Sequence, residues 1–293
     1  MENDPRMIEE CSWTIEGVEL AGLASGPEDA PVIISLHGWL DNAESFSVLR
    51  PLLPEYRFIA LDLPGHGLSG HRSPFGGYQI WDDLPQLSQL LDRLGREDYI
   101  LLGHSRGAMI AALLAAARPE RDRHLVTLDG MVPLAVEDAV FVSQLQAFMK
   151  DRARLSNKKT RVFASVAEFV ERRSRSGEPP HVAKLLASRA LRQTEDGFEW
   201  RGDPLLSGAS AVKLNQGQIE TMLDALKMPV LNIWATPAEH MKTFWEAARK
   251  LAAEKVPNLT TLDIPGHHHW HMEEAPARAM AGAIREFLSR QTP

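Results

Sequence analysis

Cysteine is almost absent from this sequence of 293 residues, and its absence narrows the possible chemistry. Cys11 is the only cysteine, so the chain can form no internal disulfide and no metal site built from several thiolates. The sequence also lacks a run of about 20 apolar residues, the length that a membrane-spanning helix needs. Its first five residues, Met1 to Pro5, lack the basic and then apolar pattern of a secretory signal peptide. We therefore expect a cytoplasmic protein with no membrane span.

An overall excess of positive charge is missing as well. The formal net charge is -7, which gives no general electrostatic reason to bind nucleic acid or an anionic membrane. One segment is locally basic, and a solvated helical face explains it better than a nucleic-acid patch does. We expect no nucleic-acid partner. The basic residues of this segment are Lys158, Lys159, Arg161, Arg172, Arg173 and Arg175.

Apolar runs alternate with helical patterns along most of the chain. Such alternation predicts an α/β fold, in which helices flank a mostly parallel central sheet. The runs do not alternate between apolar and polar residues, as is typical of strands covered on both faces. Residues Trp13–Ala24 are consistent with an antiparallel hairpin at the edge of the sheet. The expected strands are Val32–Leu36, Phe58–Leu61, Ile100–Leu102, Leu125–Leu128, Val230–Trp234 and Leu259–Ile264, and the expected helices are Leu84–Leu94, Arg106–Ala117, Glu239–Glu254 and Pro276–Arg290.

One interval breaks this alternation. Between about Pro133 and Leu226 the sequence shows helical patterns, at Val140–Lys150 and Val182–Leu191, but no convincing buried strand. We interpret residues 133–226 as a helical cap inserted over the carboxyl edge of the sheet. The core domain then consists of residues 1–132 and 227–293.

A nucleophile motif lies between a predicted strand and a predicted helix. Residues 103–107 read G-H-S-R-G, which matches the G-x-S-x-G elbow. Both glycines are needed, because a side chain at Gly103 or Gly107 would collide with neighbouring elements at so sharp a turn. The strained turn exposes the hydroxyl of Ser105 above a helix N-terminus, whose dipole favours negative charge.

A serine needs a base, and the histidine-rich segment 265–273 supplies candidates. Two of its histidines, His267 and His271, are four residues apart, a spacing that zinc sites use on helices. The preceding Pro265-Gly266 favours a loop instead, and no carboxylate motif accompanies the pair. We therefore expect no metal and no organic cofactor.

An oxyanion would be held by two backbone N–H groups. One belongs to Arg106, the residue after the nucleophile, and the other to the loop after the strand Val32–Leu36. That loop reads His37-Gly38-Trp39, and the N–H of Trp39 is the better candidate.

Taken together, these motifs resemble those of the α/β-hydrolase superfamily over nearly the whole chain. Residues 62–69, D-L-P-G-H-G-L-S, are similar to a turn that is structural in that superfamily. Residues 37–42, H-G-W-L-D-N, and the later Gly266-x-His268-x-x-His271-Met272 resemble the serine-hydrolase-like proteins. This resemblance places the catalytic histidine at His268. The distance from Pro276 seen in many relatives favours His269 instead, and we prefer His268.

The position of the catalytic acid in this sequence differs from the one that most members of the family use. Most relatives carry an aspartate shortly after the strand that matches Val230–Trp234, but here Ala238 occupies that position and Glu239 follows it. Some members of the superfamily place the acid after the preceding strand, where this sequence has Asp129. A carboxylate there can orient the imidazole from the other side. We favour Asp129 over Glu239.

These residues predict a serine hydrolase that forms an acyl-enzyme on Ser105 from an ester or related carbonyl compound. The expected substrate is a small molecule, an apolar acyl ester. Serine at the elbow argues against the dehalogenase and epoxide-hydrolase branches, which use aspartate there. Two alternatives stay open: a cofactor-independent dioxygenase of the same fold, and a non-catalytic receptor for a small ligand. The sequence does not determine the oligomeric state.

Overall fold

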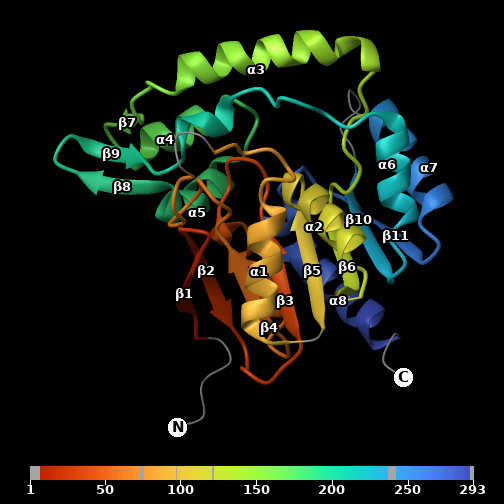
Figure 1. Ribbon diagram of the computed structural model, residues 1–293. Coiled ribbons are helices and arrows are strands. Elements are labelled where there is room, and N and C mark those ends of the chain that lie inside the picture. The colour runs from red at the N-terminus through yellow and green to blue at the C-terminus, as the bar shows by residue number, and fades with distance from the viewer. Residues whose placement is uncertain (1–6, 73–75, 97, 121, 237–241, 291–293) are drawn as a thin grey trace.

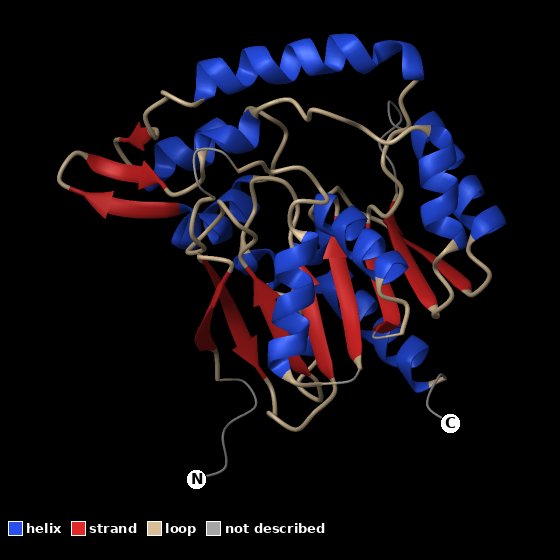
Figure 2. Cartoon of the chain, in the orientation of Figure 1, coloured by secondary structure: helices blue, strands red, loops and turns tan. Residues whose placement is uncertain are grey.

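The computed structural model describes residues 7–72, 76–96, 98–120, 122–236 and 242–290. A twisted sheet lies at its centre with helices on both faces, and a second group of elements covers the upper edge of the sheet (Figure 1 and Figure 2). Ala238 and Glu239, the positions considered for a late acid, lie outside the described residues.

The described elements follow the predicted alternation of strands and helices. The strands are β1 (Glu9–Ile15), β2 (Val18–Ser25), β3 (Val32–Leu36), β4 (Arg57–Leu61), β5 (Tyr99–His104), β6 (Asp122–Leu128), β7 (Val162–Phe163), β8 (Leu191–Thr194), β9 (Gly197–Trp200), β10 (Val230–Ala235) and β11 (Leu259–Ile264). The α-helices are α1 (Leu84–Leu94), α2 (Arg106–Ala117), α3 (Phe141–Leu155), α4 (Val166–Ser174), α5 (Pro180–Ala190), α6 (Gln216–Asp224), α7 (Lys242–Lys255) and α8 (Glu274–Ser289), and the short 3-10 helices are η1 (Ala43–Phe46), η2 (Arg50–Leu52), η3 (Asp138–Val140), η4 (Pro204–Ser207) and η6 (Trp270–Met272).

The main sheet has eight strands in the order β1-β2-β4-β3-β5-β6-β10-β11. The first two form the predicted antiparallel hairpin at the edge, and β2 is also antiparallel to β4. All the other pairs are parallel. Parallel pairing brings the carboxyl ends of β3, β5 and β6 to one edge, where Leu36 lies opposite Gly103 and His104 opposite Leu128.

Apolar side chains fill both faces of this sheet. One core cluster includes side chains of α1, α2, α6 and α7, and the other includes side chains of α8 and of the segment around η1 and η2. All five residues of β3 are buried, which explains why its sequence is apolar without alternation. The predicted bounds of α1 and α2 coincide with the observed ones, and α8 begins two residues before the predicted Pro276.

The segment above the sheet is less purely helical than predicted. It contains α3, α4 and α5, but also a three-stranded antiparallel sheet in the order β7-β9-β8. The sequence predicted helices and no convincing buried strand for residues 133–226, and these additional strands are short and largely unburied. These strands have two to four residues and side chains that are mostly exposed or half-buried, so they leave no apolar run in the sequence.

The boundaries of this cap stay a prediction. Within the predicted cap, α6 packs against α2 and α7 of the core rather than above the sheet. Its side chains Ile219, Met222 and Leu223 belong to the main core cluster.

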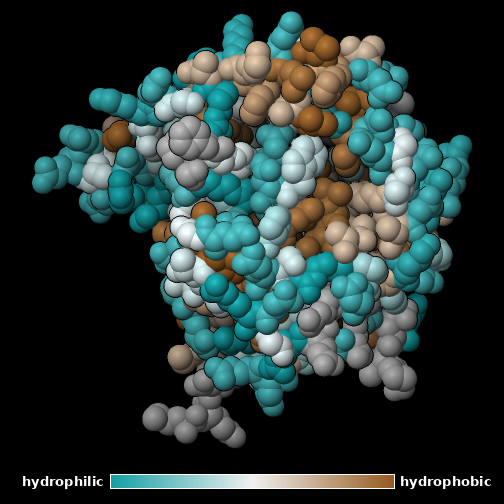
Figure 3. Space-filling model, viewed as in Figure 1, coloured by the Kyte–Doolittle hydropathy of each residue, from teal (hydrophilic) through white to brown (hydrophobic). Residues whose placement is uncertain are grey.

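Helix α3 crosses the top of the molecule and contributes little to either core. Leu155 is its only buried residue. Apolar side chains gather along this helix and below it in Figure 3, and Phe141, Val142 and Met149 are each at least 50% exposed. Within the part of the chain that the structure describes, neither α3 nor any other helix is both long enough and apolar enough to cross a membrane.

A buried ion pair connects Arg189 of the predicted cap to Asp62 of the core. The carboxylate of Asp62 accepts backbone N–H bonds from Ala43 and Leu68, and Arg189 of α5 donates to it from Nε at 3.0 Å and from a terminal nitrogen at 2.7 Å. Asp62 is fully buried and Arg189 is 4% exposed. Removing one partner of such a pair leaves an uncompensated buried charge. These contacts agree with the structural role expected of residues 62–69.

We expect Arg189→Met to lower the free energy of unfolding by about 3 to 5 kcal/mol, because the Asp62 carboxylate loses its buried partner. The measurement is urea denaturation followed by circular dichroism. Arg192→Met is the matched control, because Arg192 forms an ion pair with Glu199 while its side chain is 58% exposed; its loss should cost less than about 1 kcal/mol. Equal unfolding midpoints for the two variants would show that the ion pair between Arg189 and Asp62 does not stabilise the fold more than an exposed ion pair does.

Candidate active site

Ser105 occupies a strained position between β5 and α2. Its backbone angles are φ 52° and ψ -118°, a combination that L-residues seldom adopt and that persists only where the surroundings enforce it. The backbone N–H of Ser105 donates to the carbonyl of Leu128 at 3.0 Å, which fixes the turn against β6. Ser105 is the N-cap of α2, but its side chain makes no capping hydrogen bond, so the hydroxyl is left for other chemistry.

The two glycines of the motif are required by close packing. A Cβ atom on Gly107 would lie 2.0 Å from the carbonyl oxygen of Leu36, and one on Gly103 would lie 2.4 Å from the Cα atom of Ala108. Both distances are shorter than any real contact, and the obstructing atoms belong to the backbone. Helix α2 can therefore approach β3 and β5 closely only because both positions lack a side chain.

Asp129 follows β6 and faces the histidine loop. Its carboxylate Oδ2 lies 2.5 Å from Nδ1 of His268, and its Oδ1 accepts the N–H of Ala235 at 3.2 Å. The backbone of Asp129 is left-handed, with φ 46°, and its N–H donates to the carbonyl of Ile233 at 2.8 Å. The residue is 6% exposed. A nearly buried carboxylate is thus held on both sides while it contacts the imidazole.

His268 and Ser105 line the same cavity, which has a volume of about 370 Å³. The His268 side chain is 43% exposed, and its backbone oxygen lies 2.8 Å from Nε2 of the buried His104. Three residues selected from the sequence, Ser105, His268 and Asp129, therefore meet at the carboxyl edge of the sheet. Their catalytic roles stay predictions.

The two predicted oxyanion donors, the N–H groups of Arg106 and Trp39, lie at the same carboxyl edge of the sheet. Arg106 is the first residue of α2, so its N–H has no partner within the helix. Its guanidinium group donates to Asp83 at 3.1 Å. Gly38 and Trp39 line the cavity that Ser105 borders, and the indole N–H of Trp39 donates to the carbonyl of Leu206 at 2.9 Å.

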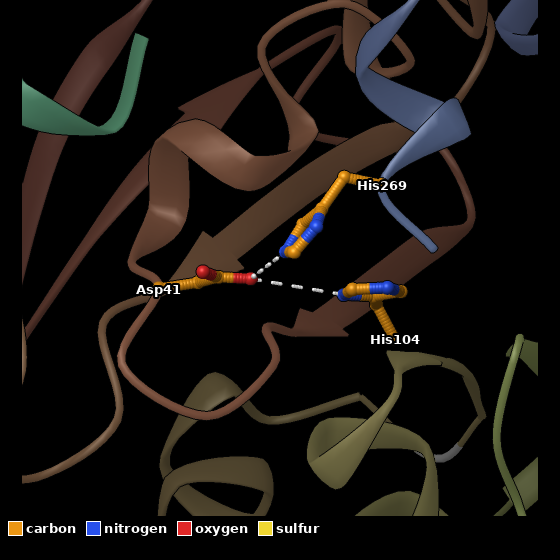
Figure 4. Close-up of side chains that lie close together, drawn as sticks. All are labelled: Asp41, His104 and His269. Carbon is orange, nitrogen blue, oxygen red and sulfur yellow. Dashed lines mark hydrogen bonds and ion pairs between the residues drawn. The ribbon is translucent and has the colours of Figure 1, made fainter. Parts of the chain in front are cut away.

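The alternative base, His269, has a different partner. Its Nε2 lies 3.2 Å from Oδ2 of Asp41, which is 2% exposed (Figure 4). Arg173 donates to the other oxygen of Asp41 at 2.8 Å and to the carbonyl of Leu40 at 2.7 Å. Only His268, not His269, is in contact with the predicted acid Asp129.

The direction in which the pKa values of Asp41 and His269 are shifted is set by their charged neighbours. Burial acts to raise the pKa of Asp41, but the adjacent His269 and Arg173 outweigh it and hold that pKa well below the usual value. Burial acts in the opposite direction on His269, and the negative charge of Asp41 outweighs it, so the pKa of His269 is raised. Burial, assisted by the neighbouring histidines, holds the pKa of His104 and of His271 well below the usual value.

The two histidines considered for a zinc pair have separate partners. Nε2 of His271 lies 2.9 Å from the hydroxyl of Ser45 in the interior, whereas Nε2 of His267 lies 2.8 Å from Glu273 near the surface.

Sequence reasoning missed the cluster of Asp41, Arg173 and Glu178. Arg173 donates from Nε to Glu178 at 2.7 Å and so joins two carboxylates across the cap boundary. Asp41 lies within the motif at residues 37–42, and Arg173 within the basic run, but nothing in the sequence pairs positions 132 residues apart. Four of the five other basic side chains of this run border a cavity of about 200 Å³; they are Lys158, Lys159, Arg161 and Arg172.

Comparison with known proteins agrees with this architecture. The family model described as the alpha/beta hydrolase fold matches residues 31–276. The chain belongs to the α/β-hydrolase family. The predicted fold class is confirmed by this match.

Several relatives are named serine hydrolases or serine hydrolase-like proteins. A serine hydrolase-like protein of Dictyostelium discoideum is 30% identical over 287 residues, which cover 93% of this chain and 79% of that protein. One from Danio rerio is 29% identical over 302 residues, covering 98% and 90%. The crystal structure of a hypothetical protein from Pseudomonas aeruginosa superposes with a TM-score of 0.90 at 36% identity, covering 96% of this chain and all of that one. The predicted resemblance to serine hydrolase-like proteins is confirmed, and it supports a hydrolase with a small-molecule substrate.

The two candidate bases can be separated by substitution. We expect His268→Gln to lower kcat/KM for p-nitrophenyl acetate by about 10⁴-fold or more, since the base that contacts Asp129 is removed. His269→Gln should stay within about tenfold of wild type, because a change outside the proton-transfer pair removes no general base. A larger loss of activity in His269→Gln than in His268→Gln would assign the base to His269.

Proposed function

We propose that this protein is a serine hydrolase that cleaves an ester or related carbonyl compound through an acyl-enzyme on Ser105. The observation that carries the proposal is the contact between His268 and Asp129 at 2.5 Å, beside a serine on a strained elbow. A serine hydroxyl is a weak nucleophile at neutral pH, and this constellation is the one that activates it in unrelated hydrolases.

Asp129 would fix the tautomer of His268. A carboxylate only accepts hydrogen bonds, so Nδ1 of His268 carries the hydrogen that it donates to Asp129. Nε2 is then the unprotonated nitrogen and can accept the proton of Ser105 as the hydroxyl attacks. The imidazolium that forms is stabilised by the same carboxylate, and it later returns the proton to the leaving group.

The developing oxyanion would be held by the N–H groups of Arg106 and Trp39. Arg106 opens α2, so the positive end of the helix dipole adds to its hydrogen bond. Loss of one such donor typically lowers kcat by about 10² to 10³-fold. The acyl group of the substrate would lie in the cavity of about 370 Å³, against the apolar parts of Trp39 and Leu40. No step of this route requires a metal or an organic cofactor.

Three variants test the proposal on a series of p-nitrophenyl esters of increasing chain length. We expect Ser105→Ala to lower kcat/KM by at least about 10⁴-fold, because the nucleophile is lost. Asp129→Asn should lower it by about 10³ to 10⁴-fold, because the amide favours the wrong tautomer of His268. Glu239→Gln is the control for the acid and should retain wild-type activity.

Other results would point elsewhere. A large loss in Glu239→Gln with none in Asp129→Asn would move the acid to the later position. If the protein consumes O₂ in the presence of a hydroxyquinolone, and the Ser105→Ala variant still does so, the result would indicate the dioxygenase. Return of every tested ligand with unchanged mass would indicate the receptor.

A further inference from the structure

Three potential ligand atoms converge beside the nucleophile, at a place that the proposed hydrolysis does not use. Asp41, His104 and His269 each offer one ligand atom, and these atoms lie within 4.8 Å of one another. The atoms in contact are Oδ2 of Asp41, Nδ1 of His104 and Nε2 of His269. Figure 4 shows both imidazoles facing the same carboxylate oxygen. Asp41 and His104 are buried, and all three residues border the cavity that contains Ser105.

His104 has an unused nitrogen that points at a negative charge. Its Nε2 lies 2.8 Å from the backbone oxygen of His268, and a carbonyl oxygen only accepts, so Nε2 carries the hydrogen. In the neutral ring, Nδ1 is then a bare lone pair. It is fully buried and has no hydrogen-bond partner among the described residues, and it lies 3.8 Å from Oδ2 of Asp41. Two electron-rich atoms facing each other in the interior are stabilised by a cation between them.

Gly38 lies beside both of these atoms and carries no side chain. A Cβ atom at this position would lie 3.0 Å from Oδ2 of Asp41 and 3.0 Å from Nδ1 of His104. The missing side chain therefore borders the gap between the two ligand atoms. Any larger residue would crowd both of them.

The distances fit a transition-metal ion. Zinc takes imidazole nitrogen and carboxylate oxygen at about 2.0 to 2.2 Å, so adjacent ligand atoms in a tetrahedral site lie about 3.4 Å apart. Here Oδ2 of Asp41 lies 3.2 Å from Nε2 of His269 and 3.8 Å from Nδ1 of His104. Two imidazoles and one carboxylate also form a donor set that divalent transition metals prefer to Ca²⁺ or Mg²⁺.

The charged groups around the three ligand atoms are of both signs. Two carboxylates, Asp41 and Glu178, border this part of the cavity together with one guanidinium group, that of Arg173. Arg173 holds the second oxygen of Asp41 at 2.8 Å, which is the way an outer residue orients a ligating carboxylate.

We propose that Asp41, His104 and His269 form a binding site for one divalent transition-metal ion of the zinc class. A site with three protein ligands keeps a position for water or for an atom of the substrate. This site differs from the pair His267 and His271 that the sequence suggested, and it departs from the expectation that the chain has no metal site. It does not depend on the proposed hydrolysis.

The test is calorimetric titration of Zn²⁺ into protein that carries no histidine tag and has been stripped with EDTA. We expect one ion per chain, and a melting temperature that rises with free Zn²⁺. His269→Gln and Asp41→Asn should each weaken binding by more than about 100-fold, since loss of an outer partner alone costs 10 to 100-fold. The titration is repeated on Ser105→Ala, in which binding should persist whatever becomes of the hydrolase activity.

His267→Gln is the matched control, because His267 belongs to an exposed cluster with His181 and Glu273 that also has metal-ligand spacing. This variant should bind Zn²⁺ as wild type does. Co²⁺ provides a measurement on unmutated protein: visible absorption bands should appear and should be removed by one equivalent of Zn²⁺. The proposal is overturned if folded wild type binds neither ion, if binding survives in both ligand variants, or if His267→Gln abolishes it.

Discussion

The site depends on the close approach of helix α2 to the sheet. Gly103 and Gly107 allow backbone atoms to approach to distances that no side chain permits, and the turn between them forces Ser105 to a positive φ. Parallel pairing then brings Asp129, from the end of β6, and Gly38, from the end of β3, to the same edge. The strain at Ser105 is offset by these contacts, and they leave its hydroxyl at the mouth of a cavity.

The cap completes the site rather than merely covering it. Three hydrogen bonds hold the loop after β3: the side chains of Trp39 and Asn42 donate to the carbonyls of Leu206 and Leu186, and the carbonyl of Leu40 accepts from Arg173. The same loop carries the predicted oxyanion donor Trp39 and the buried Asp41. Docking of the cap, fastened through the ion pair of Asp62 with Arg189, therefore fixes the geometry of that loop. We expect substitutions at these cap contacts to change the geometry of the loop after β3.

Much of this arrangement was predictable because it follows from local rules. Buried parallel strands leave apolar runs, and an elbow needs glycine on both sides of its serine, so β3, β5, α2 and Ser105 could be located from the sequence. Asp129 was selected through the resemblance to the α/β-hydrolase superfamily, some members of which place the acid after the matching strand. The contact of His268, rather than His269, with Asp129 depends on the path of a loop, and no periodicity encodes it. The short strands β7, β8 and β9 escaped prediction because they bury little apolar surface, and the pairing of Asp41 with Arg173 joins distant parts of the chain.

Activation of Ser105 by His268 and Asp129 is the basis of the proposed chemistry. Intact-protein mass spectrometry after exposure to a fluorophosphonate tests it most directly, because this probe reacts with activated serines and needs no knowledge of the substrate. We expect one adduct per chain on wild type, none on Ser105→Ala, and much slower labelling of Asp129→Asn. Folded wild-type protein that forms no adduct, or an adduct that persists in Ser105→Ala, would contradict it.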